Sequence, residues 1–196
     1  TMTNSMKLHR RYARVVKRTS LPLALSCMLL ATLDAQAENC RLSLSQSRVD
    51  YGAIRRDAVV ENAAVVLATR TFNLTVLCVE PAVMALRFVA APADGQGFRF
   101  GREGRFRLRL KHAQVDGRAV GWVSAQAPDE SANGQLLPGQ ALVARGAGVP
   151  VAGRRFTAQV DLDTELPFEA LMVRGEAHLE GMGSFELISQ AVPPSQ

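Results

Sequence analysis

Apolar and polar residues alternate in short runs over most of the chain after residue 38. In the clearest run, 71–78, Phe72, Leu74 and Val76 share one face, while threonine and asparagine occupy the other. A period of two predicts a half-buried β-strand. Similar alternation predicts further strands over residues 41–47, 83–89, 105–111, 120–123, 156–162, 171–180 and 184–188.

Turn signals separate these runs. Pro81 and the Pro92–Gly95 cluster are expected to bracket the strand at 83–89, and Asp116-Gly117 predicts a tight hairpin turn. Residues 124–139 are polar and predict a long surface loop, whereas 57–67 suit a helix or a strand equally. Eight or nine short strands at near-regular spacing predict an all-β fold, an antiparallel β-sandwich.

The first 37 residues differ from the rest. A basic stretch precedes the apolar run Leu21–Leu33, and Ala35-Gln36-Ala37 follows it. This order predicts a signal peptide, because a membrane span needs roughly 20 apolar residues. Two alternatives remain open, a single anchor helix and a lipoprotein acylated at Cys27. The domain is then expected over 38–190, with a disordered tail at 191–196.

After cleavage at Ala37, Cys40 and Cys78 are the only cysteines left. An even pair in an exported chain predicts one disulfide. That bond closes a loop of 38 residues and stabilises the fold by roughly 3–4 kcal/mol on a chain-entropy model.

Composition bounds the class of protein. The chain has 196 residues, 47% of them hydrophobic, which suits one domain with a sizeable core and excludes disorder. The net charge of +5 suggests an acidic partner, but six of the 23 cations and one of the 18 acids lie in residues 1–37. The remainder holds 17 of each and is neutral, which argues against nucleic acid as a partner.

Candidate chemistry is sparse, so we expect no catalytic residue, no cofactor and no metal, and therefore no enzyme. A strand over 171–180 would place Glu176, His178 and Glu180 on one face. These residue types could bind a divalent cation, but we expect the three side chains simply to face water. His112 is expected to be solvated. Two charged rows are expected to face solvent: Arg105, Arg107, Arg109 and Lys111, and Asp161, Asp163 and Glu165. The basic row is expected to discourage edge pairing, and the alternative is that it docks an acidic partner or an anionic glycan.

Three stretches resemble bacterial fimbrial subunits of the chaperone–usher type. They are the cysteine followed by alternating leucines at 40–44, the Val-Asp-Tyr-Gly-Ala-Ile element at 49–54, and the strand 71–78 that ends in the second cysteine. The end of the chain, with Gly175-Glu176-Ala177 and Ser184–Ile188, also resembles the closing strand of these pilins.

The resemblance implies an immunoglobulin-like sandwich that lacks its last strand. Such a fold leaves a hydrophobic groove that another chain fills by strand addition. Here the groove would be lined by Leu42 and Leu44 from the first strand and by Phe185 and Leu187 from the last. The implied partners are a periplasmic chaperone, an outer-membrane usher and neighbouring subunits, and the implied locations are the periplasm and then the fimbrium at the cell surface.

The chain also departs from that pattern. Only Glu38 and Asn39 would precede Cys40 after cleavage, too few to donate a strand, and this suits a tip or minor, non-donating subunit in cell adhesion. The alternative is a self-complete, monomeric periplasmic sandwich that binds a ligand through its loops. In that case Ala191-Val192 would extend a final self-pairing strand.

Overall fold

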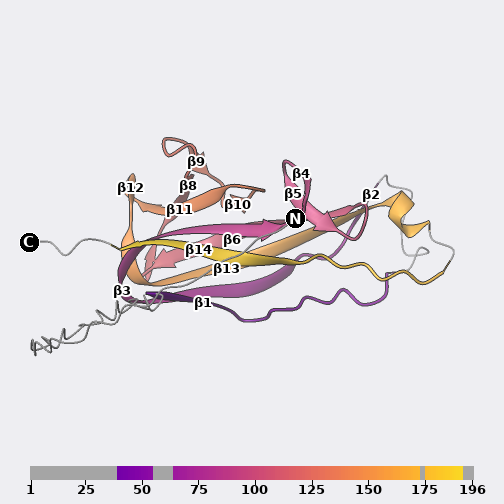
Figure 1. The fold of residues 1–196 in the computed structure, drawn as a ribbon, viewed down its shortest axis with the longest axis horizontal. Coiled ribbons are helices and arrows are strands. Elements are labelled where there is room, and N and C mark those ends of the chain that lie inside the picture. Colours follow the sequence, from indigo (N-terminus) through magenta and orange to yellow (C-terminus); the bar gives the residue numbers. More distant parts are fainter. Residues whose placement is uncertain (1–38, 55–63, 173–174, 192–196) are drawn as a thin grey trace, which may run out of the picture. The chain divides into compact units, whose positions relative to one another are not determined.

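The computed structural model describes residues 39–54, 64–172 and 175–191, all within one compact unit. They form a 14-stranded antiparallel sheet and one short 3-10 helix, η2 (Figure 1). The elements in chain order are β1 (Cys40–Leu44), β2 (Ala64–Val66), β3 (Arg70–Ala90), β4 (Pro92–Asp94), β5 (Gly97–Phe100), β6 (Gly104–Val115), β7 (Arg118–Ala119), β8 (Gly121–Ser124), β9 (Ser131–Ala132), β10 (Gln135–Leu136), β11 (Ala141–Gly146), β12 (Val149–Pro150), β13 (Ala152–Pro167), η2 (Phe168–Leu171) and β14 (Gly183–Ala191).

The main path of the sheet runs β4-β5-β6-β13-β3-β11-β8-β9. β3 is its centre, since its first half pairs with β1 and β13 and its second half with β14 and β11. The all-β, antiparallel prediction is confirmed. The curled sheet, with two successive sets of neighbours around one long strand, is consistent with an incomplete sandwich.

The sequence predicted that Pro81 lies in a turn between two strands, and this prediction is wrong. Pro81 lies inside β3, at the step where pairing with β13 jumps from Leu77 to Ala82. Pro81 lacks an N–H group, and the irregularity leaves its position without a ladder bond to β13, so the proline is tolerated there. β3 therefore passes from one set of neighbours to the other without a loop.

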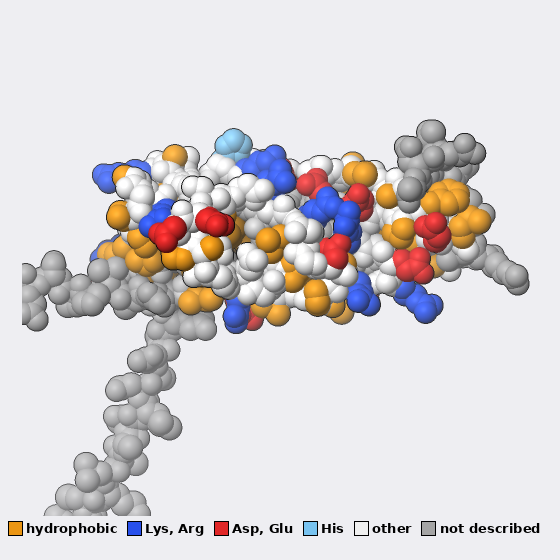
Figure 2. Space-filling view, turned by 90° about the horizontal axis from the view of Figure 1, so that it is seen from above, with side chains coloured by type: hydrophobic (Ala, Val, Ile, Leu, Met, Phe, Trp, Pro, Cys, Tyr) orange, Lys and Arg blue, Asp and Glu red, His pale blue; other side chains and the backbone are white. Residues whose placement is uncertain are grey.

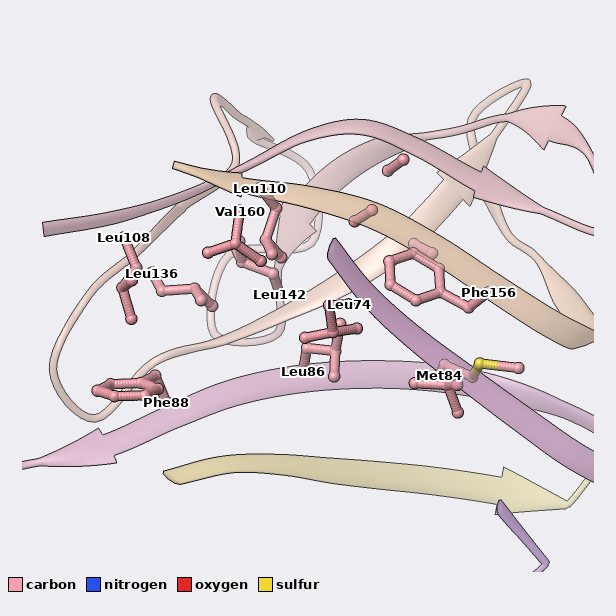
Figure 3. Close-up of a cluster of buried hydrophobic side chains, with 14 of the residues drawn as sticks. Leu74, Met84, Leu86, Phe88, Leu108, Leu110, Leu136, Leu142, Phe156 and Val160 are labelled. Carbon is pink, nitrogen blue, oxygen red and sulfur yellow. The ribbon is translucent and has the colours of Figure 1, made fainter. Parts of the chain in front are cut away.

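The inward faces of the strands build one core. Leu74, Val76, Leu86 and Phe156 are almost completely buried, and Figure 3 shows side chains from β3, β6, β11 and β13 pointing toward one another. Trp122 of β8 packs edge-on against Phe156, with ring centroids 5.6 Å apart. The alternation predicted for β3, β6 and β13 is confirmed, because each buried position is followed by a more exposed one over most of these strands.

Two predicted elements are wrong. Residues 171–180 do not form a strand: η2 ends at Leu171, and the described residues 175–182 have no regular structure. The glycines at 175 and 181 disfavour a strand in this segment. The predicted loop at 124–139 contains β9 and β10, and Leu136 is fully buried because β10 pairs with β6.

The Asp116-Gly117 turn is confirmed, with both residues at positive φ (48° and 80°), but the predicted return strand is divided. Directly after the turn, β7 pairs with β6. Trp122, which was predicted to lie in the same return strand, lies in β8 and pairs with β11. The Asp116 carboxylate accepts the backbone N–H groups of Arg154 and Arg155, which fixes this turn against the start of β13.

Among the described residues, no helix has the length and hydropathy needed to cross a bilayer. The signal-peptide prediction and the Cys27 alternative concern residues 1–37, which lie outside the described residues. β14 ends at Ala191, one residue beyond the predicted end of the domain, and 192–196 are also outside them.

Candidate functional site

β1 and β14 lie on the same side of β3. Leu74 pairs with Leu44 of β1 on one side and with Ala158 of β13 on the other. Further along β3, Ala82 pairs with Ala191 of β14 on one side and again with β13 on the other. Since β13 stays on one side throughout, β1 and β14 share the opposite side. The space along their two outer edges is called the seam below.

The seam is open, whereas the other side of the molecule is closed. Among the described residues, β3 is the only strand that pairs with β1 or β14. On the other side, β10 pairs with β6, and Leu110 N donates a hydrogen bond to Gly134 O at 2.8 Å. Two edge strands with free outer edges are therefore left together in one place, a ready template for a further strand.

The four residues that the resemblance implies as a groove, Leu42, Leu44, Phe185 and Leu187, all lie on the two strands that border the seam. Each is half-buried and packs against the core from one side. Their ladder partners on β3 are buried: Val76, Leu74, Phe88 and Leu86. The apolar surface that remains exposed on these four residues therefore faces away from β3, along the seam.

Phe185 partly fills the seam. Its ring centroid lies 4.9 Å from that of Phe88, its neighbour on β3, and 6.3 Å from that of Phe72 in the other half of β3. Both contacts are edge-to-face, the favoured geometry for aromatic pairs. The ring thus connects the parts of the core under β1 and β14.

The backbone of β1 also presents hydrogen-bonding groups to the seam. Ser45 N donates to Asn73 O, and Val79 N donates to Asn39 O, so odd-numbered residues of this segment bond to β3. Hydrogen-bonded and non-bonded pairs alternate in antiparallel ladders, which turns the backbone groups of Leu42 and Leu44 outward. An added strand would find both donors and apolar contacts at these residues.

The N-terminal end of β1 is fixed twice. The predicted Cys40–Cys78 disulfide is present and joins β1 to β3 across a sequence separation of 38. Immediately before it, the side chain of Asn39 donates to Glu80 O at 3.1 Å and accepts from Glu80 N at 2.8 Å. No local pattern in the sequence predicts this second attachment, because it depends on the register of two strands and joins residues 41 positions apart.

The two charged rows were predicted to face solvent, which is wrong for Asp161, because that residue is buried, and most of their charges neutralise each other. β6 and β13 are adjacent, and Arg105 lies 2.7 Å from Glu165, while Lys111 lies 2.6 Å from Asp161. Arg105 also binds Asp94, and Arg107 binds Glu165. Figure 2 shows basic and acidic side chains next to one another on the face it displays. Because β6 is also a paired strand, the prediction that its basic row discourages edge pairing is wrong.

These ion pairs predict how stability depends on pH. The hydrogen bond from Lys111 lowers the pKa of Asp161, and the one from Arg105 lowers the pKa of Glu165. A carboxylate whose pKa is lower in the folded state than its ordinary value near 4 stabilises the fold when the pH is above that ordinary value. This stabilisation is lost as the pH falls through the lower pKa of the folded state. The free energy of unfolding should therefore decrease between about pH 5 and pH 3.

Asp161 is the best position for testing this, because only 12% of its side chain is exposed and Thr71 also donates to it. Asp161→Asn should cost about 1–3 kcal/mol at pH 7 and flatten the pH dependence of denaturant unfolding. Asp129→Asn, in an exposed turn, is the matched control. An unchanged pH profile in Asp161→Asn would contradict the assignment.

The remaining candidates carry no chemistry. His178 is highly exposed, 3.7 Å from Glu180, in a segment that is not a strand, so the predicted shared face with Glu176 does not exist. His112 is exposed at a positive φ of 49°, where β6 bulges opposite β13. The described residues contain no group of three or more potential metal ligands.

Comparisons with known proteins add little. No family model matches the chain, and no curated protein matches it in sequence. Among solved structures, the P pilus rod subunit PapA matches with 10% identity and a TM-score of 0.45, over 78% of this chain and 99% of that one. At this level of similarity, the function of the chain has to be inferred from its own residues.

Proposed function

We propose that this chain is an exported, non-enzymatic subunit of the fimbrial type, and that a β-strand from another protein completes its seam. The observation that carries the proposal is the placement of Leu42, Leu44, Phe185 and Leu187, half-buried, along two free edges on the same side of β3. A strand added there would gain main-chain hydrogen bonds and bury these side chains at once. The export step rests on the predicted signal peptide.

The partners proposed for this seam follow the fimbrial resemblance. A periplasmic chaperone would supply the strand first, and a neighbouring subunit would replace it at an outer-membrane usher. If cleavage follows Ala37, Asn39 is already bonded to β3, and only Glu38 is left before it. Such a chain receives a strand without donating one, which supports a tip or minor subunit, with a role in adhesion, as the more specific proposal.

A second candidate function is a self-complete monomeric binding protein. Two observations favour it: β14 continues to Ala191, and Phe185 already reaches Phe72 across the seam. In that case, the apolar surface left open along the seam is small enough to be tolerated in water, and ligand binding would rest on loops.

Expression in the periplasm of a Gram-negative host separates the two. The exported chain alone should aggregate or be degraded, and a co-expressed fimbrial chaperone should recover it as a one-to-one complex on size-exclusion chromatography. A soluble monomer that melts cooperatively without a partner would overturn strand complementation and leave the self-complete protein as the function.

A further inference from the structure

The two strands that border the seam differ in charge. β1 and β14 carry one charged residue each, Arg41 and Glu186. Glu186 is already neutralised, because Arg87 of β3 donates a hydrogen bond to its carboxylate at 2.6 Å. Arg41 is exposed and makes no ion pair with any carboxylate of the described residues. Within the described chain, the β1 border of the seam therefore carries an unpaired positive charge, whereas the single charge of the β14 border is balanced.

The neighbours of Arg41 across the sheet supply no counter-charge. Arg41 pairs directly with Leu77 of β3, and Leu77 pairs on its other side with Arg155 of β13. The three side chains share the outer face of the sheet, and all three are exposed. This row across three strands thus holds two cations and no acid. The position beside Arg41 on the open side of β1 is where a carboxylate of an added strand would meet its guanidinium group.

The backbone of β1 favours close contact at this position. Leu42 and Leu44 turn their hydrogen-bonding groups toward the seam, so Arg41 and Ser43 take the non-hydrogen-bonded positions opposite a strand added antiparallel to β1. Side chains approach one another most closely at such positions, where the Cα atoms are about 4.5 Å apart. A side chain opposite Arg41 would lie on the same outer face, within reach of the guanidinium group.

We infer that Arg41 selects the strand that completes the seam, by pairing with an aspartate or glutamate on the outer face of that strand. The inference rests on the proposed function, because it concerns the same site. Arginine forms two parallel hydrogen bonds with a carboxylate, and opposite charges directly across neighbouring strands stabilise a sheet. The next outer position meets Ser43, whose hydroxyl donates to Thr75 O at 3.3 Å, so no charge is required there. The strand therefore alternates apolar side chains, placed over Leu42 and Leu44, with a carboxylate opposite Arg41.

The size of the effect follows from the position of Arg41. An opposite-charge pair across two strands strengthens their association by up to about fivefold, and a like-charge pair weakens it by a similar factor. Lysine in place of the carboxylate should therefore weaken strand binding by roughly 20-fold. Arg155 has far less influence, because adjacent strands lie about 4.8 Å apart and an added strand would be roughly 14 Å from β13. That distance exceeds the screening length of about 8 Å at physiological salt.

The test uses the chain purified from the periplasm in complex with a co-expressed fimbrial chaperone. Synthetic peptides of alternating valine and threonine, long enough to cover both border strands, are added, and release of the chaperone is measured by size-exclusion chromatography. One threonine at a time is replaced by aspartate or by lysine, so that no register has to be assumed. At one position, aspartate should bind about fivefold more tightly than threonine and roughly 20-fold more tightly than lysine.

Variants of the chain assign this preference to one residue. Arg41→Glu should reverse the preference at that position, and Arg41→Gln should remove it. Arg155→Glu is the matched control and should leave the preference unchanged, since Arg155 is also exposed and lies in the same row but not beside the added strand.

Three outcomes would overturn the inference. These are equal binding of aspartate and lysine peptides at every position, an unchanged preference in Arg41→Glu, and a reversal in Arg155→Glu as large as that in Arg41→Glu. Failure of the proposed function looks different, because the chain would then form no chaperone complex, or no peptide of either charge would displace the chaperone. In that case the inference is overturned together with the proposed function.

Discussion

Replacement of Leu187 by aspartate is expected to abolish strand complementation while changing the stability of the uncomplemented chain only slightly. Leu187 is half-buried at the seam, so in the free chain its carboxylate replacement keeps contact with water and costs about 1 kcal/mol of lost apolar burial. Once a strand covers the seam, the charge would be buried without a partner. That costs roughly 3–5 kcal/mol, which corresponds to a more than 100-fold weaker complex.

The measurement is co-purification with a co-expressed fimbrial chaperone, together with thermal melting of whatever free chain is recovered. Ile188→Asp is the matched control, since Ile188 is the next residue of β14, is 39% exposed and faces the outer side of the sheet. The Ile188 variant should still form the complex. Equal loss of the complex in both variants would show that β14 tolerates no charge and would remove Leu187 from the proposed site.

Replacement of both Cys40 and Cys78 by serine is expected to lower the free energy of unfolding by about 4 kcal/mol, within the usual range of 2–5 kcal/mol for a native disulfide. The bond closes a separation of 38 residues and joins β1, an edge strand, to the central strand β3. Without it, β1 is retained by the ladder and the Asn39 hydrogen bonds alone. The seam should then lose one of its two borders.

Denaturant unfolding measures the loss, and hydrogen exchange locates it. Amides of β1 should lose protection before those of β13, which pairs with strands on both sides. Cys27→Ser is the control, because residues 1–37 are predicted to be removed during export. Equal loss of protection in β1 and β13 would contradict the view that β1 is held separately at the edge.

Periodicity predicted the strands that carry most of the core. In β3, β6 and β13 the alternation is long, and the buried positions found in the structure, such as Leu74, Leu108 and Val160, are those on the predicted inward face. Periodicity did not predict the structure correctly where strand formation depends on pairing with another strand. The 171–180 segment alternates well enough for a strand, but the described residues 175–182 pair with no strand.

The sequence predicted two solvent-facing charged rows, whereas the structure buries Asp161 and pairs most of these charges with one another. The sequence shows a basic row and an acidic row, each suited to a solvated face. Only the pairing of β6 with β13 places Arg105 beside Glu165 and Lys111 beside Asp161, so that a basic row expected to be available to a partner is largely neutralised. The same pairing logic leaves Arg41 and Arg155 on either side of Leu77, which no local pattern could have indicated.

The sequence by itself determined the class of fold, the two cysteines that pair and the residues that face inward, because alternation and cysteine count are local properties. The tertiary structure alone decided that β1 and β14 border one seam and that, among the described residues, β3 is the only strand that pairs with either of them. Edge strands are defined by the neighbour that is missing, and a missing neighbour depends on how segments more than a hundred residues apart come together on β3. Whether Leu42 and Leu187 belong to a core or to a binding surface follows from that placement, and their side chains are equally apolar in either case.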